Sequence, residues 1–133
     1  TDAGALGPDG TLWVMNYMFP GDADDLRPGP DAVADRWGEG PSHAASNTVE
    51  RLLRLTVGAA GITLAEAPPI QLALAADGAS RNWEGLAELG GGFVLATDKF
   101  PSTILAYLPP PGAAPTAASA AATPSADPAT PGP

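Results

Sequence analysis

The fold is decided by the stretch from Arg81 to Pro101, which reads RNWEGLAELGGGFVLATDKFP. Two apolar runs flank three consecutive glycines, Gly90–Gly92. Glycine readily adopts the positive φ angles that tight hairpin loops require. The stretch therefore predicts a β-hairpin with its loop at Gly90–Gly92.

The same pattern occurs a second time near the start of the sequence. A shift of 81 residues aligns Gly10 with Gly91, Phe19 with Phe100 and Pro20 with Pro101. Residues 1–20 and 82–101 are therefore two copies of one supersecondary unit. Repeated antiparallel units are typical of propellers, solenoids or arrays.

Other apolar runs predict further strands between and after the two copies. They are Thr11–Phe19, Val49–Val57, Ile62–Ala65, Ile70–Leu74 and Thr103–Leu108. Residues 49–57 suit a helix face as well as a strand face, and their context favours the strand. Residues 11–19 are apolar at both alternating sets of positions, so this strand is expected to be covered on both faces. The fold class is all-β with antiparallel strands.

Two segments interrupt this β pattern. Residues 20–47 are rich in Asp, Pro and Gly, and we expect a long acidic loop because Pro and Gly break helices and strands. Residues 109–133 hold 8 Pro and 9 Ala among 25 residues, with one charge. That composition cannot bury a core, so it predicts a disordered tail or linker that follows a folded part at residues 1–108.

Composition excludes several classes of partner. The chain has 6 Lys and Arg against 15 Asp and Glu, a net charge of −9. Phosphate backbones attract basic surfaces, so we expect no nucleic-acid partner. No apolar run approaches the roughly 20 residues of a membrane helix, so we expect no membrane span. The chain has no Cys, which excludes disulfides and thiolate chemistry.

Asn82-Trp83-Glu84-Gly85-Leu86, followed by the glycine-rich hairpin, resembles bacterial six-bladed β-propellers. The most similar groups are the esterase-like-activity-of-phytase and SdiA-regulated proteins, and the wider relatives are gluconolactonase and strictosidine-synthase-like propellers. The resemblance covers residues 1–108 and implies four-stranded blades with calcium in the channel of the metal-binding members. The chain would supply about one and a half blades. We therefore expect a C-terminal fragment of an extracytoplasmic propeller that packs against the remaining blades.

Register within the hairpin predicts a metal site. With Gly90–Gly92 as the loop, Leu89 faces Phe93 and Glu84 faces Asp98. Directly opposed side chains have Cβ atoms about 4.5–5.5 Å apart, and two carboxylates at that distance suit a bridging Ca²⁺. The alternative is a slip of one residue that places Glu84 opposite Lys99 as a salt bridge.

Other acidic and polar residues carry weaker signals. Asp22, Asp24 and Asp25 invite a calcium-loop interpretation, but Arg27 and Val33 stand where the EF-hand pattern needs Gly and Glu, so a solvated loop is expected. His43 is the only histidine, and a solvated loop position is expected for it. Because the strands alternate in direction, residues 20–47, 75–81 and 99–102 should meet at one end of the sheets.

Two functions from different classes follow. If the protein is an enzyme, it is a metal-dependent hydrolase of a phosphoester, ester or lactone, with Glu84 and Asp98 as calcium ligands. The alternative is a non-enzymatic binding or scaffold propeller at the cell surface, with structural carboxylates and the tail as a spacer.

Overall fold

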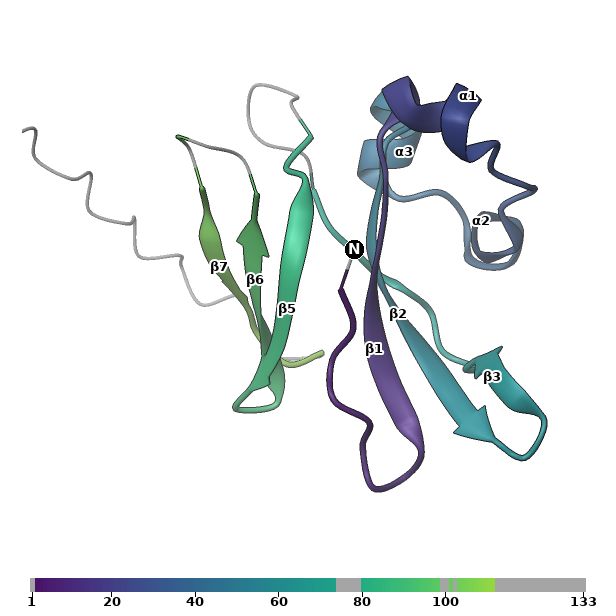
Figure 1. The fold of residues 1–133 in the computed structure, drawn as a ribbon, viewed down its shortest axis with the longest axis vertical. Coiled ribbons are helices and arrows are strands. Elements are labelled where there is room, and N and C mark those ends of the chain that lie inside the picture. Colours follow the sequence, from purple (N-terminus) through teal and green to yellow (C-terminus); the bar gives the residue numbers. More distant parts are fainter. Residues whose placement is uncertain (1, 74–79, 99–100, 102, 112–133) are drawn as a thin grey trace, which may run out of the picture.

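Two antiparallel sheets stand side by side in the computed structural model, which describes residues 2–73, 80–98, 101 and 103–111 (Figure 1). The first contains β1 (Thr11–Met18), β2 (Val49–Gly58), β3 (Gly61–Leu64) and β4 (Ile70–Gln71). The second contains β5 (Trp83–Leu89), β6 (Gly92–Thr97) and β7 (Leu105–Leu108). The predicted architecture of mainly antiparallel strands is confirmed.

The predicted hairpin at residues 81–101 forms as β5 and β6, but its loop is shorter than expected. Gly90 and Gly91 have φ angles of +58° and +79°, and Gly92 pairs with Leu89. Positive φ at both central residues is the requirement of the two-residue type I′ turn, whose twist matches that of the flanking strands. The three-residue loop was therefore wrong by one residue, and Glu88 rather than Leu89 pairs with Phe93.

The first sheet follows the predicted strands closely. β1 pairs with β2 along the whole length of β1, and β3 returns along β2 after a turn at Ala59–Ala60. β4 pairs with β2 beyond the end of β3, after the irregular stretch that contains Pro68 and Pro69. β4 therefore continues the line of β3 along the same edge of β2.

The first residues of the chain lie between the two sheets. Ala3 forms an isolated bridge with Val14 of β1, and Met15 N–H donates to the Asp2 carbonyl at 2.7 Å. On the other side, the Leu86 N–H of β5 donates to the Asp2 carboxylate at 2.9 Å. Residues 2–4 thus join the adjacent strands β1 and β5.

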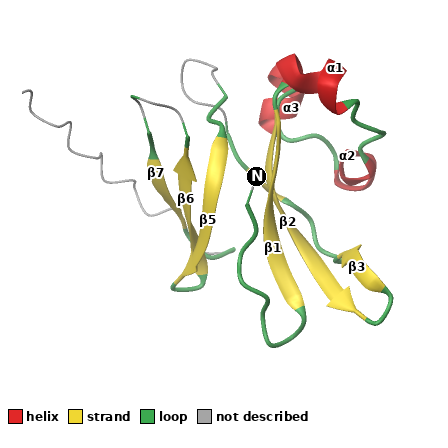
Figure 2. Ribbon diagram, in the orientation of Figure 1, coloured by secondary structure: helices red, strands yellow, loops and turns green. Residues whose placement is uncertain are grey.

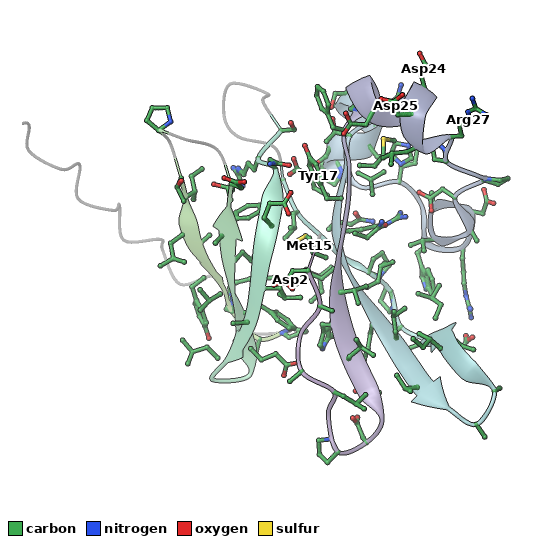
Figure 3. All side chains as sticks on the ribbon, in the orientation of Figure 1. Asp2, Met15, Tyr17, Asp24, Asp25 and Arg27 are labelled. Carbon is green, nitrogen blue, oxygen red and sulfur yellow. The ribbon has the colours of Figure 1, made fainter. Side chains whose placement is uncertain are left out.

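The hydrophobic core is the interface between the sheets. Its buried members are Met15, Leu52, Leu72, Trp83, Leu86, Phe93 and Leu95. Met15 points from β1 toward the second sheet (Figure 3) and is fully buried. Trp13 meets Phe93 edge-on, with ring centroids 5.2 Å apart. Two apolar sheet faces burying each other stabilise the fold by about 25 cal/mol for each Å² removed from water.

The prediction that residues 20–47 form an irregular loop is wrong. They contain a 3₁₀ helix, η1 (Pro20–Asp22), and three short α-helices: α1 (Ala23–Leu26), α2 (Ala32–Trp37) and α3 (Pro41–Ser46). Pro20 and Pro41 begin helices, because a first helical position needs no N–H donor. Pro and Gly therefore separate the helices rather than prevent them. We call residues 20–47 the helical segment.

The Pro/Ala-rich segment falls outside the described residues apart from Pro109–Pro111, so its predicted disorder stays a prediction. The last strand, β7, ends at Leu108. Within the described part of the chain, none of the helices has the length and apolar character needed to cross a bilayer.

Candidate functional site

The connections of the two sheets gather at opposite ends, as alternating strand directions require. The turns at Gly7–Gly10, Ala59–Ala60 and Gly90–Gly91 lie at one end (Figure 2). The helical segment and the start of β5 lie at the other, which we call the helical end. The sequence predicted this position for residues 20–47, whereas residues 75–79, 99–100 and 102 of the same prediction lie outside the described residues.

Glu84 and Asp98 do not face each other, so the predicted register is wrong. Trp83 pairs with Thr97 and Gly85 with Ala96, which makes Glu84 the extra residue of a β-bulge. Asp98 lies opposite Asn82, whose carbonyl accepts from the Asp98 N–H at 3.2 Å. The two-residue glycine turn shifted the pairing, and the bulge shifted it again.

Calcium ligation by Glu84 and Asp98 stays a prediction, but the facing pair that motivated it is not formed. In the described ranges, no group of three or more Asp, Glu or His side chains is positioned to hold a metal ion. The alternative contact with Lys99 lies outside the described residues.

A pocket of about 430 Å³ lies where the helical segment covers the outer face of β1 and β2. Its polar lining is formed by Asn16 of β1, Arg51 of β2, Asp31 and His43. Its apolar lining comes from Met18, Pro28, Pro30, Val33 and Val49. We call this site the Arg51 pocket. The mixture of an apolar wall with a few convergent polar groups is typical of small-molecule sites.

Arg51 organises the polar wall of the pocket. Its side chain is only 6% exposed. Its Nε donates to Asn16 Oδ1 at 2.7 Å, and its Nη2 donates to Asp31 Oδ1 at 2.8 Å. Register explains the first contact, because Asn16 and Arg51 are directly paired across β1 and β2. A buried guanidinium needs such partners, because desolvating a charge is costly.

Asp31 links the sheet to the helical segment. Its Oδ1 also accepts from the N–H groups of Val33 and Ala34, both at 3.0 Å, and so caps the N-terminus of α2. Burial acts to raise the pKa of Asp31, but the hydrogen bond and charge of Arg51 with the two N–H donors outweigh it and lower that pKa. Asp31 is therefore held as a carboxylate.

His43 lies in the wall of the Arg51 pocket rather than in a solvated loop, so the expected position was wrong. It belongs to α3, which is anchored by the buried Ser42 hydroxyl donating to the Leu72 carbonyl at 2.8 Å. The His43 Nδ1 lies 3.9 Å from Asp31 Oδ2 and has no hydrogen-bond partner among the described residues. The Asp31 carboxylate is thus placed to attract a protonated imidazole.

A second buried charged group, Glu50, lies on the opposite face of β2. It is 2% exposed and sits between the sheets near Trp83. Its Oε1 accepts from the Arg81 N–H at 3.0 Å, whereas its Oε2 has no partner within the described structure. Burial raises the pKa of Glu50, although the Arg81 N–H, the Arg81 charge and the neighbouring Trp83 side chain act in the opposite direction. This carboxyl group is costly to keep ionised.

The acidic residues Asp22, Asp24 and Asp25 are exposed in η1 and α1, as the solvated interpretation expects. Figure 3 places Asp24, Asp25 and Arg27 at the outer rim of the helical end. Asp22, Asp24 and Asp25 do not line the Arg51 pocket.

Sequence reasoning missed Asn16, Asp31 and Arg51 as site residues. A signal was present for two of them, because Asn16 and Arg51 are polar positions within strongly apolar strands. Asp31 also precedes an alanine-rich run, as an N-cap does. The pairing of β1 with β2 places Asn16 beside Arg51, and the packing of the helical segment on the sheet adds Asp31.

Comparison with known proteins gives no match to a family model, to a curated protein or to a solved structure.

Proposed function

We propose that this chain forms one blade and part of the next in an extracytoplasmic β-propeller and that its helical end binds a small polar ligand. The observation that carries the proposal is the relative orientation of the two sheets. In a propeller, each blade is related to the next by rotation about a central axis, so equivalent faces point the same way around the ring.

The internal repeat supports this orientation. Trp13 and Met15 point toward the second sheet, where they contact its core residues. Their counterparts, 81 residues later, are Val94 and Ala96. These alternate along β6 with the buried Phe93 and Leu95, so they lie on the face directed away from the first sheet. Two sheets related by a face-to-face twofold would instead direct equivalent residues at each other.

The outer face of the second sheet also supports a following blade. Val94 and Ala96 pair with Tyr107 and Leu105, which are 54% and 75% exposed. Leu89, on the same face of β5, is 59% exposed. A contiguous apolar sheet face is typical of an interaction surface. A further sheet would cover it as the first sheet covers the opposite face.

The Arg51 pocket is the ligand site in this proposal. Its first candidate activity is hydrolysis of a phosphoester, ester or lactone, as in the calcium-associated propellers that the sequence resembles. His43 supports this activity, because a histidine beside a carboxylate can act as a general base, and such contacts tighten when substrate binds. Calcium rests on the resemblance alone, and no step of the proposed chemistry passes through it.

The second candidate is a non-enzymatic binding or scaffold propeller. The observation that favours it is the engagement of Arg51 by Asn16 and Asp31. In that case the contacts of Arg51 with Asn16 and Asp31 fix the helical segment on the sheet. The pocket then binds a ligand without catalysing a reaction.

Hydrolysis of chromogenic acetate, lactone and phosphate esters tests the activity, with calcium added or chelated. We expect His43→Gln to abolish turnover while the dispersion of amide NMR signals stays unchanged. His43→Gln with unaltered turnover would overturn the role of this pocket. Ligand-induced shifts of the Arg51 and His43 signals without turnover in the native chain would favour the binding protein.

A further inference from the structure

A second cavity, of about 570 Å³, lies in the groove between the two sheets and shares no lining residue with the Arg51 pocket. Its floor is formed by Trp13 and Arg54. One wall is formed by residues 67–70, which lead into β4, and the other by residues 108–111, which leave β7. Its volume is in the range of established ligand sites, about 300–1,000 Å³.

The floor of the groove combines a fixed aromatic ring with an unused donor. Trp13 and Arg54 are directly paired across β1 and β2, and the Trp13 ring is held by its edge contact with Phe93. Arg54 Nη2 donates to Asp9 Oδ2 at 3.0 Å, which fixes the guanidinium. The Arg54 Nε is buried and has no hydrogen-bond partner among the described residues.

Both walls of the groove are rich in proline. Pro68 and Pro69 line one side, and Pro109–Pro111 line the other. Grooves with aromatic side chains recognise polyproline II segments, which are rigid before binding and therefore lose little entropy, and Trp13 supplies an aromatic side chain here. Such segments also present unpaired carbonyl groups, which require a donor such as the Arg54 Nε.

We infer that this groove is a docking site for an extended proline-rich segment, and that its occupant is residues 112–133 of this chain. Pro111 already lines the groove, and the 22 residues that follow it contain 5 Pro and 9 Ala. Gly112 comes first, and glycine permits the chain to reverse toward the groove. Attachment at the rim gives this segment a high effective concentration over any free peptide.

The absence of Cys from the sequence makes a direct test possible in the full chain. A nitroxide spin label is attached to Ala118→Cys, and broadening of the Trp13 indole and Ile70 methyl NMR signals is measured. We expect loss of both signals and their recovery when the nitroxide is reduced. The matched control carries the same label and replaces the five prolines after Pro111 with Ser, which preserves the tether length but removes the polyproline preference.

Equal broadening in the native and Ser-substituted chains would overturn the inference, because tethering alone would then explain it. Arg54→Lys retains the positive charge near Asp9 and removes the Nε donor, so we expect it to weaken the broadening. If Arg54→Lys leaves it unchanged, the donor has no role and the proposed recognition is wrong. Broadening that appears only between a labelled chain and a second, isotope-labelled chain would assign the groove to another copy and overturn the intramolecular docking.

Discussion

The two faces of β2 each carry a buried charged residue, but these two residues differ in how fully their charged groups are paired. On the outer face, Arg51 donates to Asn16 and Asp31 and joins the sheet to the helical segment. On the inner face, the adjacent residue Glu50 is equally buried, yet its Oε2 has no partner among the described residues. Because these two buried residues differ in their hydrogen-bond partners, burial alone does not show whether a charged residue stabilises the fold. Arg51 is expected to stabilise the fold, and ionised Glu50 is expected to weaken it.

The largest effect is expected from Arg51→Met. This change keeps much of the buried volume but leaves Asp31 without its cationic partner. Breaking a buried ion pair costs about 3–5 kcal/mol, and we expect about 3 kcal/mol because Asp31 is partly exposed. Urea unfolding followed by circular dichroism measures the loss.

The matched control is Arg36→Met, which breaks the exposed ion pair between Arg36 and Glu66. Exposed pairs contribute little, so we expect no resolvable change in stability. A loss in Arg51→Met no larger than that in Arg36→Met would contradict the role given to the outer face.

The second effect is a pH-dependent gain from Glu50→Gln. The pKa of Glu50 is raised in the folded chain above its ordinary value of 4.5. The folded state therefore binds this proton more tightly, and the wild type should lose stability as the pH rises from 4.5 through the folded pKa. We expect the Gln variant to become more stable than the wild type over that interval, because its neutral amide avoids the cost of burying a charge.

Urea unfolding of both proteins measures this difference. The pH range is about 4 to 8, which covers the ordinary titrations of carboxyl and imidazole groups. A constant difference across the interval would show that Glu50 is satisfied by a partner. The buried charged groups on both faces of β2 would then have hydrogen-bond partners.

A smaller effect extends the comparison to the second sheet. Leu105 lies on its outer face and is 75% exposed, whereas the next residue, Ala106, packs against the core. We expect Leu105→Lys to reduce self-association and binding of a hydrophobic dye, with stability changed by less than about 0.5 kcal/mol. Light scattering and dye fluorescence report the outcome. Ala106→Lys should instead unfold the sheet, and identical behaviour of the two variants would refute the assignment of faces.

The smallest effect is expected from Asp2→Asn, at the junction of the sheets. Hydrogen bonds from the Leu86 and Ala3 N–H groups lower the pKa of Asp2 below its ordinary value of 3.8. The carboxylate therefore stabilises the fold above pH 3.8, and this contribution is lost as the pH falls through the folded pKa. We expect a loss below about 1 kcal/mol at neutral pH, because Asn still accepts a neutral hydrogen bond. Thermal melting should give equal stabilities for the two proteins in acid, and a difference that persists there would point to a steric cause.

The sequence by itself determined the strands and their antiparallel order. Apolar runs and glycine turns are local signals, so the β5–β6 hairpin and the sheet of β1, β2 and β3 could be predicted. The grouping of connections at one end followed from strand direction alone. The helices of residues 20–47 were missed because Pro and Gly at helix boundaries were taken as signs of a loop throughout.

Which polar side chains lie together in the candidate sites depends on the tertiary structure. A change of one residue in the glycine turn and one bulge separated Glu84 from Asp98, because each shift in a strand moves every later pairing. Asn16, Asp31 and Arg51 come from three distant parts of the chain and share no sequence motif. The pairing of β1 with β2 and the cap of α2 by Asp31 bring them together, and these contacts depend on packing that no local pattern encodes.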